Sequence, residues 1–303
     1  MTKVSIIIPS RNEKYLVKTV DDIFAKATGE IEIIVVVDGP TEHLLPAERP
    51  NLIFINKPMA EGLRPAIKDA AHVATGRYLL KMDAHNMVSE GFDEVLKKDC
   101  EDNWVVVSRF YILNARAWEW QSDRYDDYFY LACPWNTYQS YSFKVMPWPS
   151  RTKERESIKI DETLAIQASL WFMTAEHFHN RLGDLDVDRW GTWATEQNEI
   201  IFKTWLGGGK VMVNKNVWNA HYSRPRWERL RLVPEYSYKE ECKIHKRFAA
   251  YFLNNQWEGQ VHDSDWLIER FWPLPTIDTA ILREKYRWPT DWHTYYNKHF
   301  KNE

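Results

Sequence analysis

Short apolar runs alternate with amphipathic segments over roughly the first hundred residues. The apolar runs, which predict strands, are Val4–Pro9, Glu30–Val37, Leu52–Ile55, Tyr78–Met82 and Trp104–Phe110. Apolar residues recur at helical spacing in Tyr15–Ala27, Leu63–Ala74 and Phe92–Lys98. This alternation, with its short connections, predicts an α/β fold with a mainly parallel central sheet.

Polar side chains follow several of the predicted strands at the point where each strand ends. The turn 10–13 (Ser-Arg-Asn-Glu) follows the first strand, Asp38 follows the second, and Asp83 follows the run Tyr78–Met82. The carboxyl ends of parallel strands share one edge of a sheet, and ligands of such sheets bind there. We therefore expect the functional site at this edge.

The strand and helix pattern weakens after residue 110. The stretch Tyr111–Glu162 is rich in aromatic residues and interrupted by prolines, so we expect long loops with short strands over the sheet edge. Helices are expected at Ala194–Leu206 and around Ser237–Asn254, with a strand at Lys210–Val213 between them. The chain then divides into a principal domain, 1–224, and a Trp- and Arg-rich, mostly helical extension, 225–303.

The composition excludes several classes of protein. Charged residues make up 27% of the 303 residues and the net charge is −3, which excludes a disordered tail and a polycation. No run approaches the roughly 18 apolar residues of a membrane span, and a signal peptide is not expected. The scattered cysteines support neither a disulfide framework nor a zinc ribbon. The 16 tryptophans suit a protein that stacks on sugars or bases.

The triplet Asp83-Ala84-His85 is the clearest candidate for metal binding. A carboxylate and an imidazole two residues apart, just after a strand, can both turn toward one divalent cation. Hard oxygen combined with borderline nitrogen suits Mn²⁺ better than Mg²⁺, which stays the second choice. The alternative is a carboxylate that caps a turn beside a surface histidine.

Ordered blocks of the sequence resemble the nucleotide-binding half of family-2-type glycosyltransferases, which have the GT-A fold. The Asp-Ala-His variant resembles the polypeptide N-acetylgalactosaminyltransferases, as do two later blocks. The blocks are 4–13, 33–38, 62–64, 74–78, 82–85, 193–208 and 219–224. The resemblance implies a 1–224 catalytic domain with 111–162 as loops on the acceptor side.

The resemblance also implies residue roles. Asp83, His85 and His221 would hold the metal ion, which would assist departure of UDP from a UDP-sugar donor. Asp38 would contact the uridine or its ribose, and Arg64 the base or phosphates. The alternative for Arg64 is a solvent-facing helix residue. The other expected donor-site residues are Pro9, Arg11, Glu13, Ala168 and Ser169.

One position bears on stereochemistry. In inverting family-2 relatives a Glu-Asp pair supplies the base, whereas this chain has Glu196-Gln197 and the retaining N-acetylgalactosaminyltransferases have Asn at the second position. Because Gln197 cannot act as a base, we expect retention, with Glu196 orienting the sugar or acceptor. If Glu196 is itself the base, the enzyme inverts.

The sequence departs from the family where glycine pairs are expected. Ala168-Ser169 and Ala194-Thr195 stand in those places, so the donor is left open between a hexose and an N-acetylhexosamine. The family's membrane anchor and lectin domain are not found in this sequence. We expect a cytoplasmic enzyme of a bacterium or virus, with no obligate protein partner.

The acceptor is predicted from a basic, aromatic stretch that includes Arg224, Trp227 and Lys239. Basic residues bind phosphates and aromatic rings stack on exposed bases, so one candidate acceptor is a hydroxymethylated pyrimidine flipped out of phage-type DNA. The alternatives are a solvated helix face here, with a protein Ser/Thr or glycan hydroxyl as acceptor. Rival functions are a catalytically silent sugar- or nucleic-acid-binding protein and a nucleotidyltransferase.

Overall fold

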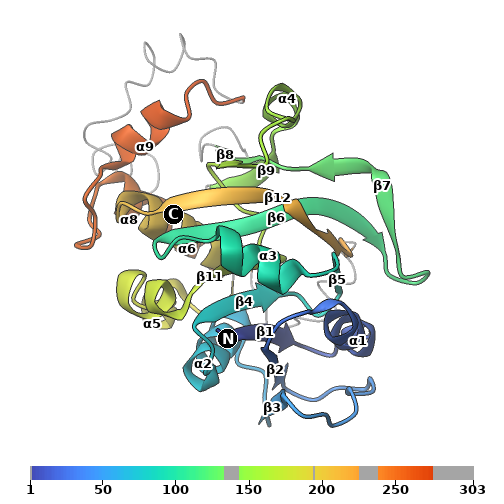
Figure 1. Ribbon diagram of the computed structural model, residues 1–303. Helices are drawn as coiled ribbons and strands as arrows, with labels where there is room; N and C mark the ends of the chain where they lie inside the picture. The colour runs from blue at the N-terminus through green and yellow to red at the C-terminus, as the bar shows by residue number, and fades with distance from the viewer. Residues whose placement is uncertain (1, 133–142, 194, 225–237, 276–303) are drawn as a thin grey trace.

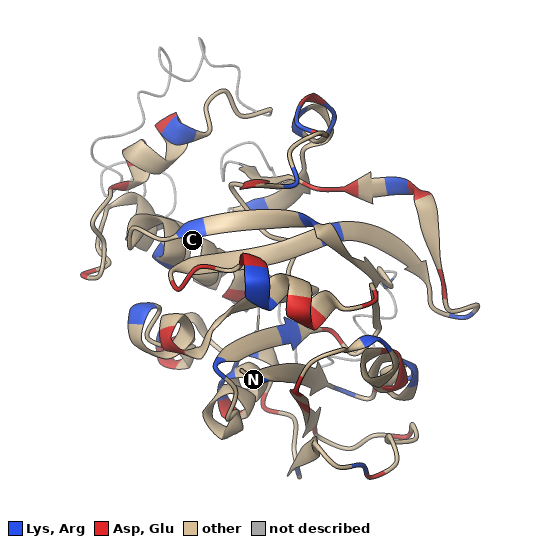
Figure 2. Cartoon of the chain, viewed as in Figure 1, with Lys and Arg blue, Asp and Glu red and all other residues tan. Residues whose placement is uncertain are grey.

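The structure is a computed structural model, and it describes residues 2–132, 143–193, 195–224 and 238–275. The fold is built on one large sheet with helices on both faces (Figure 1), and β8 and β9 form a separate two-stranded sheet. The strands run in the order β10-β12-β6-β11-β4-β1-β2-β3, with β5 beside β12 and β7 beside β6. Charged residues gather on helices and loops, and the central strands are mostly uncharged (Figure 2).

The strand bounds are β1 Val4–Ser10, β2 Ile31–Asp38, β3 Leu52–Lys57, β4 Tyr78–Met82, β5 Asn86–Val88, β6 Trp104–Asn114, β7 Glu119–Asp126, β8 Phe129–Ala132, β9 Lys144–Pro147, β10 Ile160–Glu162, β11 Leu170–Thr174 and β12 Lys210–His221. The helix bounds are α1 Leu16–Lys26, α2 Leu63–Val73, α3 Phe92–Asp99, α4 Pro149–Glu154, α5 Val187–Trp190, α6 Glu196–Leu206, α8 Tyr238–Leu253 and α9 Ser264–Arg270, together with a π-helical turn, η2, at His177–Arg181.

The sheet is mixed, but its functional edge is made by parallel strands. Strands β1, β2, β3 and β4 are parallel to one another, and β12 is parallel to β6. Strand β11 lies antiparallel between β4 and β6, so β4 and β6 run in the same direction. The carboxyl ends of β1, β2, β4 and β12 therefore meet at one edge, as the sequence predicts.

Alternate residues of each central strand pack on opposite faces of the sheet. In β2, Ile33 and Val35 contact the cluster that contains α1 and α3, whereas Ile34 and Val36 contact the cluster that contains α2, α6 and α8. Every residue of β2 is buried, which explains why its central part, Ile33–Val37, is continuously apolar and β-branched. Phe252 of α8 stacks on Phe202 of α6, so the C-terminal helices share the principal core.

Two regions differ from the sequence-based expectation. The stretch after Tyr111, predicted as long loops with short strands, contains the short strands β8, β9 and β10, but β6 also continues to Asn114 and turns into the longer strand β7. Strand β12 does not stop at Val213 but reaches His221, after a register shift between Asn214 and Trp218. A bulge of this kind interrupts the apolar alternation without ending the strand. None of the helices among the described residues is long and apolar enough to cross a membrane.

Candidate active site

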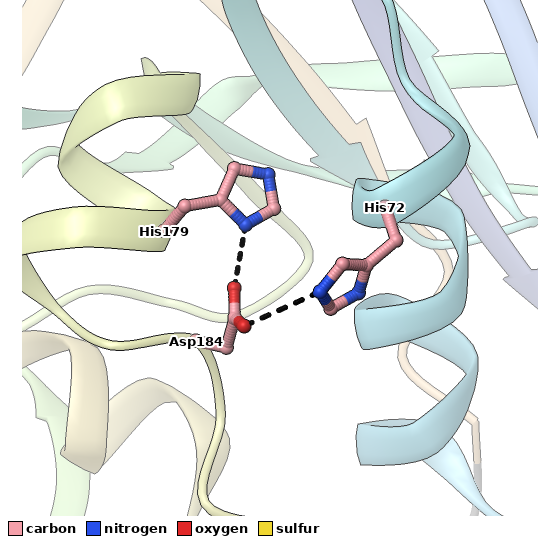
Figure 3. A group of neighbouring side chains, drawn as sticks. All are labelled: His72, His179 and Asp184. Carbon is pink, nitrogen blue, oxygen red and sulfur yellow. Dashed lines mark hydrogen bonds and ion pairs between the residues drawn. The ribbon is translucent and has the colours of Figure 1, made fainter.

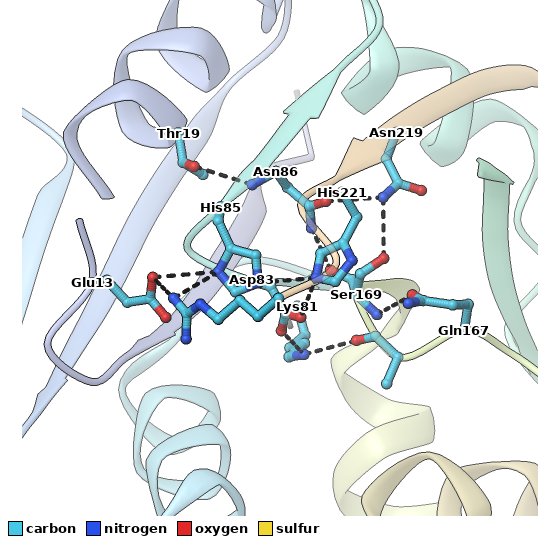
Figure 4. A network of polar contacts seen from close by, with 12 residues as sticks. Glu13, Thr19, Lys81, Asp83, His85, Asn86, Gln167, Ser169, Asn219 and His221 are labelled. Atoms are coloured by element: carbon cyan, nitrogen blue, oxygen red, sulfur yellow. Dashed lines mark hydrogen bonds and ion pairs between the residues drawn. The ribbon is translucent and has the colours of Figure 1, made fainter. Parts of the chain in front are cut away.

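The side chains of Asp83, His85 and His221 converge at the carboxyl ends of β4 and β12 (Figure 4). The Nε2 atom of His221 lies 3.1 Å from Oδ2 of Asp83 and 3.0 Å from Nε2 of His85. The donor atoms of all three residues lie within 4.8 Å of one another. One carboxylate oxygen and two imidazole nitrogens at these separations form a donor set that suits a borderline divalent cation.

The charge states of these groups are favourable for binding a cation. Burial lowers the pKa of His221 to about 4, although its hydrogen bond to Asp83 acts in the opposite direction. Burial raises the pKa of Asp83, but the Lys81 ammonium and His221 outweigh this effect and hold it well below its ordinary value. At neutral pH, Asp83 is therefore a carboxylate and His221 offers a neutral ring.

Lys81 holds the Asp83 carboxylate from within the sheet. Its side chain is only 1% exposed, and its ammonium donates to Oδ1 of Asp83 and to the carbonyl of Ala168, the latter at 2.7 Å. A buried lysine is stable only with such partners. Lys81 is not among the site residues predicted from the sequence, although a lysine in the apolar run Tyr78–Met82 is itself a signal that a buried acceptor lies nearby.

Glu13 and Arg224 complete the site on the side of His85. The Glu13 carboxylate lies 3.3 Å from Nδ1 of His85 and forms an ion pair with Arg224. Burial opposes ionisation of Glu13, but His85 and Arg224 lower its pKa below the ordinary value. A carboxylate behind a ligating histidine fixes the orientation of the ring and increases its basicity. Glu13, expected near the donor sugar, thus lies against the candidate metal ligands.

A buried network of uncharged side chains supports the three candidate ligands. The carbonyl of Ser169 accepts from the Asp83 backbone N–H at 2.9 Å and from the Asn86 amide at 2.7 Å. The Asn219 amide donates to Oδ1 of Asn86 at 3.1 Å and to Oγ of Ser169 at 3.2 Å. Asn86 and Asn219, which were also not predicted from the sequence, therefore fix the loop after β4 against β12.

Asp38 and Arg11 lie on the same edge, at the ends of β2 and β1. The Asp38 carboxylate is buried and accepts from the backbone N–H groups of Glu61 and Gly62, the former at 2.7 Å. Arg11 forms a 4.0 Å ion pair with Asp38, and Pro9 is half-buried nearby in β1. Asp38 therefore stabilises the turn that precedes α2, whether or not it contacts a ligand.

Arg64 is fully buried, so the alternative of a solvent-facing helix residue is wrong. Its guanidinium forms an ion pair with Glu199 of α6 and donates to the carbonyl of Asp186 at 3.3 Å. This pairing directs the guanidinium into the protein and links α2 to α6. Contact of Arg64 with the base or phosphates stays a prediction, and the geometry gives the residue a positioning role.

Glu196 and Gln197 are the first two residues of α6, and Glu196 lies near Lys81, Arg64 and Asp83. Glu196 is buried, and burial raises its pKa although the nearby Lys81 ammonium acts in the opposite direction. Gln197 is half-buried. Thr195 has a φ of 58°, in the left-handed region that favours glycine, at a place where the resembled family has glycine. Ala194 lies outside the described residues.

The sequence of the chain matches the model of glycosyl transferase family 2 over residues 5–174, which is more than half of its 303 residues. The chain belongs to glycosyl transferase family 2. This family 2 member is 25% identical over 222 residues to polypeptide N-acetylgalactosaminyltransferase 16 of Mus musculus, an alignment that covers 69% of this chain and 38% of the relative. The chain therefore spans about two fifths of the length of that curated relative.

Solved structures support the same fold. The crystal structure of GalNAc-T7 with UDP, GalNAc and Mn²⁺ superposes with a TM-score of 0.59 at 19% identity, over 99% of this chain and 59% of that chain. S. aureus TarS 1–349 in complex with UDP-GlcNAc superposes with a TM-score of 0.50 at 14% identity, over 86% of this chain and 68% of that chain. The family 2 chain thus has the GT-A architecture, and the expected fold and family are confirmed.

Proposed function

We propose that this chain is a metal-dependent glycosyltransferase that moves a hexose or N-acetylhexosamine from a UDP-sugar to a hydroxyl acceptor. The observation that carries the proposal is the convergence of Asp83, His85 and His221 at the carboxyl edge of a family 2 sheet. The alignment with an N-acetylgalactosaminyltransferase favours a UDP-sugar donor, and GalNAc-T7, which has the same fold, was crystallised with UDP and Mn²⁺.

The three convergent residues would hold Mn²⁺, or Mg²⁺ less well, through one oxygen and two nitrogens. A bound divalent cation would neutralise charge on the departing diphosphate. Glu13 would orient the His85 ring, because its carboxylate lies 3.3 Å from Nδ1 on the side away from the candidate metal position, while Nε2 faces His221. Lys81 keeps Asp83 ionised and fixes which of its oxygens faces the site.

The groups around the ligands would define the donor pocket. Ala168 and Ser169 border the site through their carbonyls, which bind Lys81, Asp83 and Asn86. Their side chains, where the family has glycine, would narrow the space around the C2 substituent of the sugar. A panel of UDP-sugars that differ at C2, assayed by UDP release with Mn²⁺, tests the choice between hexose and N-acetylhexosamine.

Retention follows if no carboxylate deprotonates the acceptor from the face opposite UDP. Gln197 offers an amide at that position, which supports attack on the same face with the departing phosphate taking the acceptor proton. Glu196 is the group that would make the reaction inverting. The anomeric configuration of the product, measured by proton NMR at early times, distinguishes the two, and an inverted product contradicts retention.

The acceptor that we propose is a hydroxymethylated pyrimidine of DNA. Arg224, the first residue of the basic, aromatic stretch, lies in the site against Glu13 and His85. The rest of the stretch through residue 237 lies outside the described residues. Stimulation of UDP release by DNA with hydroxymethylated pyrimidines, but not by unmodified DNA, supports this acceptor. Release stimulated only by peptides or glycans contradicts it, and no metal-dependent release with any donor favours a silent binding protein.

A further inference from the structure

A second group of metal-ligating side chains lies at the other end of α2 from Gly62, away from the Asp83 site. His72 near the C-terminus of α2, His179 in η2 and Asp184 in the following loop face one another (Figure 3). Nδ1 of His179 lies 2.6 Å from Oδ1 of Asp184, and Nε2 of His72 lies 3.4 Å from Oδ2 of the same residue. One donor atom from each residue lies within 4.8 Å of the others.

The His72 ring is held in the orientation of a ligand. Its Nδ1 lies 2.8 Å from the carbonyl of Lys68, one turn earlier in α2. A carbonyl only accepts, so Nδ1 carries a proton, and the ring in its neutral form presents the Nε2 lone pair to Asp184. A lone pair and a carboxylate attract each other only through a shared cation, either a proton or a metal ion. A backbone carbonyl behind a histidine is also the common support of a metal-bound ring.

Backbone contacts fix Asp184 between the two histidines. Its N–H donates to the carbonyl of Phe178 at 3.0 Å, and its φ of 59° places it in the left-handed region. The Phe178 ring packs edge-on against His179, with ring centroids 5.3 Å apart. Because its two carboxylate oxygens face different histidines, Asp184 holds all three donor groups on one side of the loop.

The spacing and exposure of the group suit a partly hydrated ion. With metal–ligand distances near 2.1 Å, tetrahedral ligand atoms lie roughly 3.4 Å apart, which matches the separation of His72 and Asp184. The 2.6 Å contact between His179 and Asp184 would lengthen when an ion enters between them. The His72 side chain is 52% exposed, so an ion can enter and water can fill the remaining positions. Two imidazoles with one carboxylate favour Zn²⁺, Co²⁺, Ni²⁺ or Cu²⁺ over Mg²⁺ or Ca²⁺.

We propose that His72, His179 and Asp184 form a second divalent-metal site, which takes a borderline transition-metal ion such as Zn²⁺. The bound ion would join α2 to η2 and the loop after it, segments that are otherwise separated by about a hundred residues of sequence. The start of α2, at Gly62 and Arg64, lies near Asp38 and the proposed donor site. The ion would therefore also fix the position of this helix. The proposal does not depend on the glycosyltransferase assignment.

Zn²⁺ titration of the 303-residue chain by calorimetry tests the site. We expect the wild-type chain to bind two ions, one at each group, and the His221→Gln variant to keep one. Combining His221→Gln with Asp184→Asn, or with His72→Gln, weakens the remaining affinity at least tenfold. His221→Gln combined with His262→Gln, which removes a histidine that stacks on Trp266, is the matched control and keeps the ion.

Thermal unfolding provides a readout independent of stoichiometry. Zn²⁺ should raise the Tm of His221→Gln and leave that of His221→Gln/Asp184→Asn unchanged, because only the former retains the site. Asp184→Asn is nearly isosteric, and circular dichroism of the metal-free variants verifies that they are folded. The proposal is overturned if His221→Gln binds no Zn²⁺, or if the double variants His221→Gln/Asp184→Asn and His221→Gln/His72→Gln bind it as tightly as His221→Gln does, because the group is then only a proton-shared ion pair.

Discussion

The Nε2 atoms of His85 and His221 lie 3.0 Å apart, although 136 residues separate them along the chain. The contact exists because β4 and β12 end at the same edge of the sheet, with β11 and β6 between them. Strand β5 reinforces it, since Asn86 pairs with His221 in an antiparallel register. The two imidazoles are therefore positioned by backbone pairing, and a side-chain substitution at either one should leave the fold intact.

Replacing Lys81 with methionine should destabilise the metal-free protein by about 2 kcal/mol. The variant leaves Asp83 without its main counter-charge, and the cost falls below that of a fully buried pair because Asp83 is 26% exposed. Mn²⁺ should restore more stability to Lys81→Met than it adds to the wild type, because the ion replaces the lost positive charge. Urea unfolding with and without Mn²⁺ measures both effects, and an equal Mn²⁺ effect in the two proteins would contradict this role of Lys81.

The Arg64–Glu199 ion pair should be far more important for stability than exposed pairs of the same kind. Replacing Arg64 with methionine removes one of the two cationic partners of the buried Glu199 carboxylate, which keeps Lys203 at 2.6 Å, and we expect a loss of about 2 kcal/mol. The matched control is Arg77→Met, which breaks an exposed pair with Asp102 and should change the free energy of unfolding far less. Similar losses of unfolding free energy in the two variants would show that the buried Arg64–Glu199 pair stabilises the fold no more than an exposed pair does.

His177 should make the protein less stable in acid. Burial lowers its pKa from 6.5 to about 4, so below pH 6.5 the unfolded chain takes up a proton that the folded chain does not. The free energy of unfolding therefore falls between pH 6.5 and pH 4, by about 3 kcal/mol from this group in total.

The His177→Gln variant tests this contribution through the slope of stability against pH. Its stability should fall less steeply than that of the wild type between pH 6.5 and pH 4.5, whatever its stability at pH 7. His262→Gln serves as the control because that imidazole is half-exposed. His177 lines a cavity of about 850 Å³ at the edge of the sheet opposite the candidate active site, so the change should leave Mn²⁺ binding unaffected.

Replacing Gln197 with alanine should slow transfer roughly tenfold without abolishing it, because an amide that only positions the reactants takes no proton in the reaction. Glu196→Gln is the informative companion, since it removes the carboxylate at the start of α6 that could act as a base. If Glu196→Gln abolishes transfer and the wild-type product is inverted, the proposed retention is wrong. Melting curves for both variants establish that they are folded.

The candidate metal ligands could be predicted because they stand in ordered motifs. Asp83 and His85 come directly after an apolar run, and His221 stands in a block that resembles the same family. The support for these ligands could not be predicted in the same way. Lys81 depends on the carbonyl of Ala168, and Arg64 on Glu199, and these partners lie far away in sequence.

The errors in the predicted fold also arise from contacts between segments that are far apart in sequence. The predicted strand at Lys210–Val213 stops where Asn214 and Asn216 suggest a turn, but pairing with β6 carries β12 through a register shift to His221. The sequence around Tyr111 looked irregular because aromatic residues occupy both faces of the β6–β7 hairpin. Phe110 lies in the principal core, whereas the next residue, Tyr111, packs against Trp120 of β7, so apolar and polar residues do not alternate here.

Mn²⁺ binding measured by electron paramagnetic resonance in the presence of UDP tests most directly whether Asp83, His85 and His221 hold the catalytic cation. We expect the wild type and the control Glu258→Gln, which changes an exposed carboxylate, to bind one UDP-dependent Mn²⁺ per chain. His221→Ala and Asp83→Ala should lose this ion and the Mn²⁺-dependent release of UDP while keeping their circular dichroism spectra. Wild-type Mn²⁺ binding and turnover in either folded variant would contradict the assignment.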